Sequence, residues 1–205
     1  MKQLDLGVIG NCAIASLIDR NARHVWFCYP RLDGDPIFNA LVNGDAPEHG
    51  LMDVVLKDQT GSQQSYLRNT AILETILTAQ SGSIRVVDFA PRFKVGGELY
   101  RPPAIIRRIE PMTGRCHVTV RVRPTFDYGE TTPTQTFGSH HVRYLAGNDA
   151  IRVSTDMPIA YLREEVSFLL DRPVHLIVGS DERPADRIER LARAQLEETI
   201  AYWND

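Results

Sequence analysis

The chain has few cysteines and no long hydrophobic run. Cys12, Cys28 and Cys116 show none of the CxxC spacings typical of zinc or redox sites. We therefore expect reduced, buried thiols, with a contact between Cys12 and Cys28 as the alternative. No stretch of about 18 apolar residues is present, which excludes a membrane-spanning helix. Asp5 interrupts the apolar region that a signal peptide would need, so the sequence predicts a cytoplasmic protein.

The chain also lacks a large excess of positive or negative charge. The 23 Lys and Arg residues face 26 Asp and Glu residues, which gives a formal net charge of -3 without any block of like charges. Nucleic acid and membrane surfaces are therefore not expected as partners. With 205 residues, 43% of them hydrophobic, the chain is long enough to bury the core of an ordinary folded domain.

Common catalytic and metal-binding motifs are missing. The sequence contains no GxSxG, no GxxxxGK[ST], no dinucleotide fingerprint and no HExxH. His140 and His141 would point to opposite faces of a strand, which argues against a shared metal ion. The adjacent Glu164 and Glu165 are interpreted as surface charge. We expect no metal and no cofactor.

Alternation of apolar and polar residues is the strongest structural signal. Between Arg115 and Arg123, apolar side chains occupy every second position, which predicts a half-buried strand. Turn signals such as Ser81-Gly82, Gly96-Gly97 and Gly147-Asn148 separate similar runs. The pattern predicts an all-β protein, a large two-sheet antiparallel sandwich. The other predicted strands cover residues 25–29, 52–56, 70–78, 83–89, 105–109, 142–145, 151–155, 161–168 and 174–178.

Two segments are predicted to be helical. Residues 36–42 could form one short turn, because proline is allowed at the first helical position. Residues 184–203 show apolar side chains at helical spacing, which predicts an amphipathic helix. The apolar stripe of this helix runs to Ile200 and Trp203 at the end of the given sequence, where we expect both side chains to be exposed.

One loop carries a dense set of aromatic and charged residues. The aromatic strand that contains Trp26 and Tyr29 leads into a loop with Arg31, Asp33 and Asp35. A guanidinium and carboxylates beside aromatic rings can hydrogen-bond to sugar hydroxyls and pack on a sugar face. The alternative is that an Arg31–Asp33 ion pair holds the loop in shape and that Trp26 belongs to the core.

These segments also resemble a known family. The runs Gly10-Asn11-Cys12, Ala15 to Asp19 and Trp26 to Asp33 resemble the opening of bacterial glucoamylase-like and trehalase-like proteins of glycoside hydrolase family 15. Leu32 stands where the family pattern has Phe. The resemblance continues through Asp88 to Arg92, Arg107-Arg108-Ile109, Arg123 to Gly129, Phe168-Leu169-Leu170 and Glu197 to Trp203.

The resemblance implies a division of labour. In that family, an N-terminal supersandwich precedes an α/α barrel that carries two catalytic glutamates and cleaves α-glucosidic bonds with inversion. We therefore expect a sandwich domain over residues 1–181 and a linker helix over 182–205, with no catalytic residue in this chain. The barrel is the expected partner, in the same chain or a separate one, with an α-glucoside as the substrate.

The same resemblance assigns candidate site residues. Trp26, Tyr29, Arg31, Asp33 and Asp35 become candidates for the substrate entrance or the domain interface. Two alternatives stay open: a free-standing carbohydrate-binding sandwich, and a module that self-associates through the surface intended for the barrel, including Ile200 and Trp203.

Overall fold

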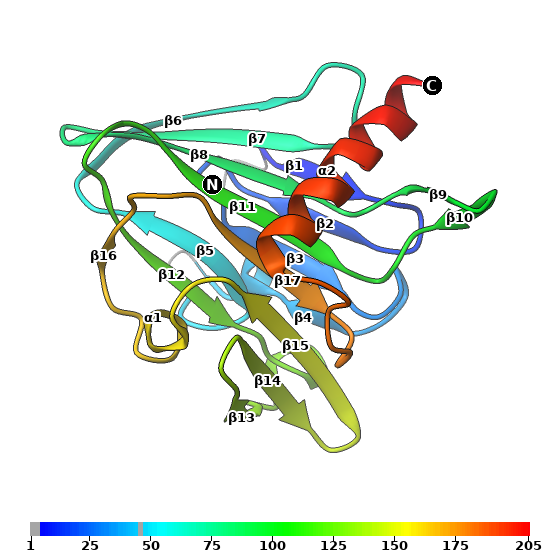
Figure 1. The fold of residues 1–205 in the computed structure, drawn as a ribbon. Helices are drawn as coiled ribbons and strands as arrows, with labels where there is room; N and C mark the ends of the chain where they lie inside the picture. Colours follow the sequence, from blue (N-terminus) through cyan, green and yellow to red (C-terminus); the bar gives the residue numbers. More distant parts are fainter. Residues whose placement is uncertain (1–4, 45–46) are drawn as a thin grey trace.

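Two antiparallel sheets form the protein. The computed structural model describes residues 5–44 and 47–205. The sheets face each other as a sandwich, and a helix near the C-terminal end of the sequence crosses the outer face of one of them (Figure 1). The predicted all-β sandwich is therefore confirmed. No helix in the described parts of the chain is long and apolar enough to cross a membrane.

The first sheet has the strand order β1-β2-β3-β5-β12-β16, and β4 pairs with β3 beside this path. Its strands are β1 (Gly7–Gly10), β2 (Ala15–Ile18), β3 (His24–Cys28), β4 (Pro36–Phe38), β5 (Leu51–Leu56), β12 (His117–Arg123) and β16 (Phe168–Leu169).

The second sheet has the order β13-β14-β15-β17-β11-β8-β7-β6. Its strands are β6 (Gln59–Tyr66), β7 (Leu73–Ala79), β8 (Gly82–Phe89), β11 (Ile105–Gly114), β13 (Thr134–Phe137), β14 (His141–Ala146), β15 (Asp149–Thr155) and β17 (Val174–Gly179). A separate hairpin joins β9 (Phe93–Val95) to β10 (Glu98–Tyr100).

The core lies between the sheets because both inner faces are apolar. On β12, Val118, Val120 and Val122 are buried and alternate with more exposed polar residues, as their spacing predicts. They belong to one large hydrophobic cluster that includes residues of both sheets. Alternation on the facing strands thus builds the single main core.

Helix α2 (Ile188–Asn204) covers the outer face of the second sheet. It begins four residues later than predicted and packs against β17 and β9. Its buried Ala192 lies over a small second cluster that contains Val87 and Phe89 of β8 and Ile106 of β11. These strands are therefore buried on both faces, which explains why apolar residues occupy adjacent positions at Val86-Val87 and at Ile105-Ile106.

Two predictions of local structure are corrected. Residues 161–168 were expected to form a strand, but helix α1 (Ile159–Arg163) occupies the first part, and only Phe168 belongs to β16. Leu162 is buried in the core, and the Tyr161 and Phe168 rings stack with centroids 4.3 Å apart. A short apolar run does not distinguish a helix turn from a strand, and here packing decided.

The predicted helix over residues 36–42 is wrong in its first half. Pro36 to Phe38 form β4, in which Phe38 pairs with Phe27 and is fully buried. Only Ala40–Val42 is helical, as the 3-10 turn η1. A second 3-10 turn, η2, spans Asp127–Gly129. Burial of two aromatic rings in the core outweighs the weak helical preference of this short segment.

Candidate functional site

Three loops that carry family motifs meet at one end of the sandwich. They are residues 11–14 between β1 and β2, residues 29–35 between β3 and β4, and residues 90–104, which contain the β9–β10 hairpin. We call this surface the loop end; it lies on the right-hand side of Figure 1. Antiparallel pairing places the ends of β1 and β3 and the start of β2 at the same edge of the first sheet.

The 29–35 loop is held by its own hydrogen bonds. The Tyr29 backbone N–H donates to the Asp35 carbonyl over 3.1 Å, and the Gly34 N–H donates to the Arg31 carbonyl over 3.0 Å. Arg31 Nε and Nη2 donate to the two carboxylate oxygens of Asp33 over 2.9 and 3.0 Å. The ion pair between Arg31 and Asp33 that the sequence suggested is therefore present in this loop.

The Arg31–Asp33 pair is open to solvent. The side chains are 76% and 72% exposed, so water screens their attraction. The hydrogen bonds from Arg31 and from the Asp33 backbone keep the pKa of the Asp33 carboxyl below its usual range. Asp33 is therefore a charged hydrogen-bond acceptor at neutral pH and is poorly suited to donate a proton as a general acid.

The aromatic residues near this loop are divided between the core and its border. Phe27 is fully buried, and its ring packs edge-on against Tyr29 with centroids 6.1 Å apart. Tyr29 is half-buried against the main core. Trp26 is half-buried on β3, and Asp35 is exposed. Tyr29 thus pairs with Phe27, and the structure does not assemble Trp26 and Tyr29 into one aromatic platform.

Asn11 links two of the three loops, residues 11–14 and residues 90–104. Its side-chain N–H groups donate to the carbonyls of Pro91 (3.0 Å) and Pro102 (2.8 Å), and its side-chain oxygen accepts the backbone N–H groups of Ala13 and Ile14. Asn11 is fully buried. In the sequence, Asn11 stands out only as part of a family motif, without a sign of this role.

We expect Asn11→Ala to lower the free energy of unfolding by about 2–3 kcal/mol, because buried backbone groups lose their hydrogen-bond partners. Urea denaturation of the isolated chain measures this change. Asn148→Ala on the exposed β14–β15 turn is the control and should leave the urea midpoint unchanged. Equal midpoint shifts for both variants would contradict the assigned role.

Arg92 connects the same loops to helix α2. Its Nη1 donates to the Asn11 carbonyl over 2.5 Å, and its backbone N–H donates to the Thr199 hydroxyl over 3.2 Å. The guanidinium lies over the rings of Tyr202 and Trp203, 5.0 and 5.9 Å from their centroids. Motifs separated by 81 and 107 positions therefore stabilise one another here.

The expectation for the C-terminal end of the helix is corrected. Ile200 packs against the second cluster on the outer face of the sheet, so it is not an exposed residue waiting for a partner. Trp203 is half-buried, beneath Arg92 and edge-on to Tyr202. The helix itself supplies the cover that the outer face of the sheet requires, because the strands below it present apolar side chains outward.

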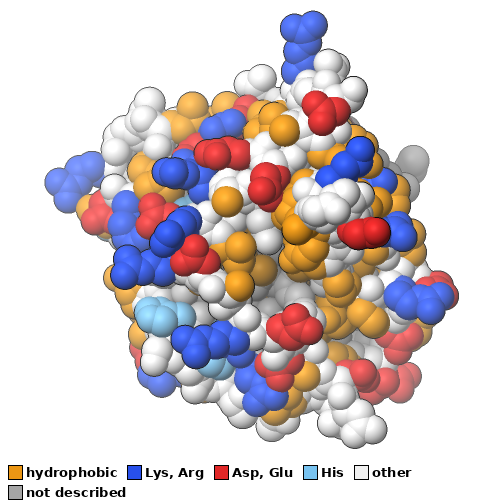
Figure 2. Space-filling model, turned by 45° about the vertical axis from the view of Figure 1, so that its right-hand side comes forward, with side chains coloured by type: hydrophobic (Ala, Val, Ile, Leu, Met, Phe, Trp, Pro, Cys, Tyr) orange, Lys and Arg blue, Asp and Glu red, His pale blue; other side chains and the backbone are white. Residues whose placement is uncertain are grey.

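Exposed apolar side chains occur at the loop end instead. Leu32 is 54% and Val95 is 58% exposed, and Leu99 and Tyr100 of the hairpin are also exposed. Figure 2 brings this side of the molecule forward and shows hydrophobic side chains around a hollow. Apolar patches of this kind mark surfaces that contact another protein or domain.

A charged network that the sequence analysis missed lies between the sheets. Asp88 of β8 accepts hydrogen bonds from Arg107 Nε (2.8 Å) and Nη2 (3.0 Å) and lies 3.2 Å from His24 Nε2. His24 Nδ1 lies 2.7 Å from the Ser16 hydroxyl oxygen. The Arg107 guanidinium also donates to the Ala22 carbonyl over 2.5 Å. All four side chains of the network are buried.

Burial and the arginine set the protonation states of this network. Burial raises the pKa of Asp88, but Arg107 and His24 outweigh this effect and hold it at about 2. Burial lowers the pKa of His24, so the ring is neutral at pH 7. With a hydrogen on Nε2 facing Asp88, Nδ1 is an acceptor, and the single hydrogen of the Ser16 hydroxyl has both Nδ1 (2.7 Å) and the Trp26 carbonyl (3.0 Å) within reach.

The chain Ser16–His24–Asp88 has the residue types of a nucleophilic triad but not the accessibility. No substrate reaches the Ser16 hydroxyl, which is fully buried between the two sheets. The network therefore links the sheets and does not form an active site. Its sequence signal was visible: Asp88 and Arg107 occupy inward positions on strands whose other inward residues are apolar, as Val86 and Ile109 illustrate.

Other candidate groups have local partners. Glu165 pairs with Arg123 over 2.6 Å, and Glu164 pairs with Arg163. Residues 5–44 and 47–205 contain no group of three or more His, Cys, Asp or Glu that could hold a metal ion. The three cysteines are free, so Cys12 and Cys28 form no disulfide, and only Cys116 is buried as predicted; Cys12 is exposed and Cys28 half-buried.

Fold and loop end together define a β-sandwich domain that presents one partly apolar end to solvent. The family described as trehalase-like, N-terminal, matches residues 4–172, and the chain belongs to this family. The expected resemblance is thereby confirmed at the level of a trehalase-like N-terminal region.

Curated relatives are larger proteins. Trehalase 1 of Sulfolobus acidocaldarius is 27% identical over 208 aligned residues, which cover 98% of this chain and 34% of that protein. The trehalase of Thermoplasma volcanium is 26% identical over 156 residues, which cover 75% of this chain and 24% of that protein. The chain thus spans about a third or less of their length. No solved structure matches it significantly.

Proposed function

We infer that this chain is the non-catalytic N-terminal sandwich of a trehalase-type glycoside hydrolase and that its loop end packs on the catalytic domain. The observation that carries this proposal is the exposure of Leu32, Val95, Leu99 and Tyr100 at the end where the family motifs converge. Apolar side chains there have a physical reason to exist if another domain covers them. The matched trehalases are long enough to hold a further domain.

The carboxylates of the loop end support the non-catalytic role. An inverting glycosidase requires a general acid and a general base, about 6.5–9.5 Å apart across the scissile bond. Asp33 is held ionised by Arg31, so it does not suit the role of the acid. The proposal therefore places the catalytic pair in the partner domain, with an α-glucoside such as trehalose as the substrate.

The proposal also covers the domain limits, the family of the parent enzyme and its cellular location. Residues 1–181 form the sandwich unit, and residues 182–205 lead toward the catalytic domain while α2 closes the sandwich. The parent enzyme belongs to glycoside hydrolase family 15, which includes glucoamylases, and acts in the cytoplasm, where three free thiols stay reduced. In this proposal, the loop with Arg31 and Asp33 borders either the contact between the domains or the substrate entrance.

We expect the isolated chain to release no glucose from trehalose or maltooligosaccharides above the rate of a buffer blank. A fusion in which it replaces the matching third of Sulfolobus acidocaldarius trehalase 1 should hydrolyse trehalose. A coupled glucose assay measures both rates. Glucose release by the isolated chain would overturn the non-catalytic role and make Asp33 and Asp35 the first residues to mutate.

The docking surface has its own test. Leu32→Asp combined with Val95→Asp places two charges on the loop end, and we expect the fusion to lose at least about tenfold in activity because charges would be buried at the contact. Met112→Asp is the control, since this exposed side chain lies at the opposite end of β11. The isolated chain should keep its melting temperature in all variants. Equal activities of the two altered fusions would exclude the loop end as the contact.

A further inference from the structure

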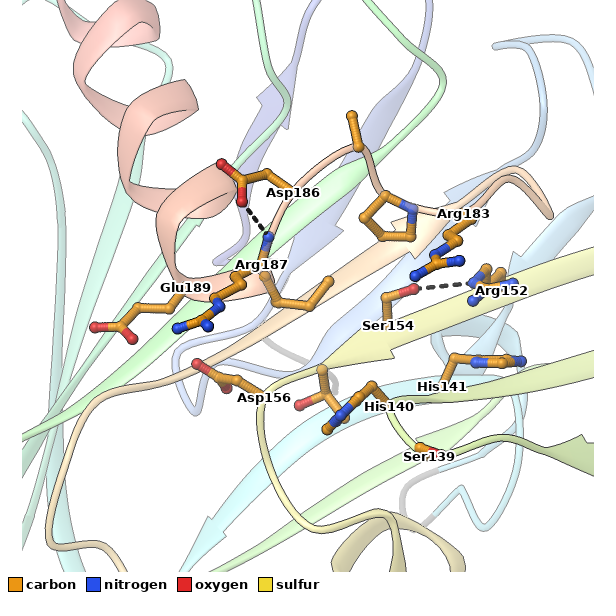
Figure 3. A pocket seen from close by; sticks show the side chains of 14 residues that line it. Ser139, His140, His141, Arg152, Ser154, Asp156, Arg183, Asp186, Arg187 and Glu189 are labelled. Carbon is orange, nitrogen blue, oxygen red and sulfur yellow. Dashed lines mark hydrogen bonds between the residues drawn. The ribbon is translucent and has the colours of Figure 1, made fainter.

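A cavity with a volume of about 1250 Å³ opens on the outer face of the second sheet, beside the first turn of α2. Strands β14 and β15 supply one wall, and the segment before and at the start of α2 supplies the other (Figure 3). None of the residues that line this cavity belongs to the loop end, so the inference does not depend on the proposed function.

Three arginines (Arg152, Arg183, Arg187) and three acids (Asp156, Asp186, Glu189) line the cavity, but no described carboxylate lies within hydrogen-bond distance of Arg152 or Arg183. Arg143 Nε donates to the Asp181 carboxylate and lies 2.8 Å from each of its two oxygens. Arg152 Nη1 is 3.8 Å from Asp181, which is beyond hydrogen-bond distance. Arg183 has no acceptor among the described residues. Asp181 therefore forms hydrogen bonds with Arg143 alone, although Arg152 lies nearby.

Asp156 and Asp186 also line the cavity, but they are engaged elsewhere. Asp156 accepts the backbone N–H of His175 over 2.8 Å and lies 2.7 Å from its ring Nδ1. Asp186 pairs with Arg190 of α2 over 3.0 Å. The remaining acid, Glu189, points away from Arg152 and Arg183 in Figure 3. None of these carboxylates therefore neutralises the Arg152–Arg183 side of the cavity.

Like charges lie close together in this cluster and affect the pKa values of its members. Burial lowers the pKa of Arg152, Asp181 opposes this effect, and the nearby Arg143 and Arg183 lower the pKa further. Burial lowers the pKa of His141, and Arg152 and Arg143 add to this effect. An anion in the cavity would relieve this repulsion, because it would favour the charged forms of all these groups.

A buried hydroxyl completes the arrangement. Ser154 is only 3% exposed, lines the cavity and accepts the Arg152 Nε hydrogen over 3.1 Å. None of the described residues accepts the hydrogen of this hydroxyl. A buried donor without an acceptor is costly unless a ligand or water occupies the space in front of it.

We propose that this cavity binds the phosphate group of a small metabolite between Arg152 and Arg183, with Ser154 and His141 as further donors. These donors come from β14, β15 and the segment before α2, so they approach a ligand from several directions. A tetrahedral phosphate offers oxygens in several directions, whereas a carboxylate offers them in one plane. Arginine is the side chain best suited to such an anion.

The test is isothermal titration calorimetry of the whole chain in chloride buffer of constant ionic strength. Inorganic phosphate, glucose 6-phosphate and glucose are titrated separately. We expect saturable binding of at least one phosphate compound and none of glucose. Tighter binding of glucose 6-phosphate assigns the site to a phosphate ester, and tighter binding of inorganic phosphate assigns it to the free ion. Absence of saturable binding by both overturns the proposal.

Variants show whether the binding occurs in this cavity. Arg183→Gln and Arg152→Gln should each weaken phosphate binding by about ten- to a hundredfold, because each removes charged hydrogen-bond donors. Arg68→Gln removes the same charge from an exposed turn outside the cavity and should change the Kd less than about twofold at constant ionic strength. Equal losses in Arg183→Gln and Arg68→Gln would reduce the effect to net charge and overturn the proposal.

A loss of binding in Arg183→Gln can be distinguished from a loss of folding. Arg183 is exposed and has no partner among the described residues, so its replacement should leave the melting temperature unchanged. In NMR spectra, phosphate should shift the backbone amide signals of Ser154 and Arg183 and leave those of the loop end unchanged. Shifts confined to the loop end would place the anion elsewhere and overturn the assignment.

Discussion

Asp88→Asn should lower the free energy of unfolding by about 3–5 kcal/mol. The substitution leaves the guanidinium of Arg107 charged, buried and without its counter-ion between two sheets. Arg107 Nη1 already has no hydrogen-bond partner, so the site has no spare acceptor to compensate. Chemical denaturation of the isolated chain measures the change.

The chain offers a matched control for this effect. Asp33→Asn breaks the same kind of two-point contact with an arginine, but at a site where both side chains are exposed to water. This variant should unfold at the same urea concentration as the unaltered chain. Similar losses for Asp88→Asn and Asp33→Asn would mean that burial is not what makes the Asp88 contact strong.

A double variant that removes both charges distinguishes the stability contributed by the ion pair from the penalty of leaving one buried charge unpaired. Asp88→Asn combined with Arg107→Met should be more stable than Asp88→Asn alone, because no charge is then left buried. A double variant as unstable as the sum of the two single variants would show that the residues act independently.

Acid should destabilise the protein in two steps. Asp88 has a pKa of about 2 when folded and about 3.8 when unfolded, so its contribution is complete above pH 3.8 and disappears as the pH falls toward 2. The shift corresponds to about 2 kcal/mol. His24 is held neutral by burial, so the unfolded chain binds a proton that the folded chain does not, and stability begins to fall below about pH 6.5.

Urea midpoints measured between pH 7 and pH 2 test this dependence. His24→Gln removes the titrating ring, so the slope of the free energy of unfolding between pH 6.5 and 5 should become flatter, whatever the absolute stability of the variant. His49→Gln replaces an exposed histidine and should leave the slope unchanged. A His24→Gln chain that keeps the original slope would show that another group is responsible.

Strand periodicity predicted the sandwich because the main core has two apolar faces. Alternation on β12 and the strands like it requires burial on one side, and short turns require antiparallel neighbours. The same approach missed β6, a polar edge strand, since half of its environment is solvent and its residues show no alternation. It also missed α1, where a short apolar run fits either structure.

The candidate site was only partly predictable. The bond between Arg31 and Asp33 joins residues two positions apart, so the local sequence was enough to suggest it. The contacts of Asn11 with Pro91 and Pro102 span 80 or more positions. From the sequence alone, these three residues are recognisable only as members of family motifs or as loop residues, because their contact partners are not known.

The sequence by itself determined the all-β class, the strand periodicity and the family, because these depend on local alternation and on the order of motifs. Only the tertiary structure showed that Asp88, Arg107 and His24 meet between the sheets, that Ile200 covers a sheet, and that Arg152 and Arg183 share one cavity. The physical reason is that burial and pairing depend on residues distant along the chain, and a charged side chain gives no local sign of the partner that it will meet.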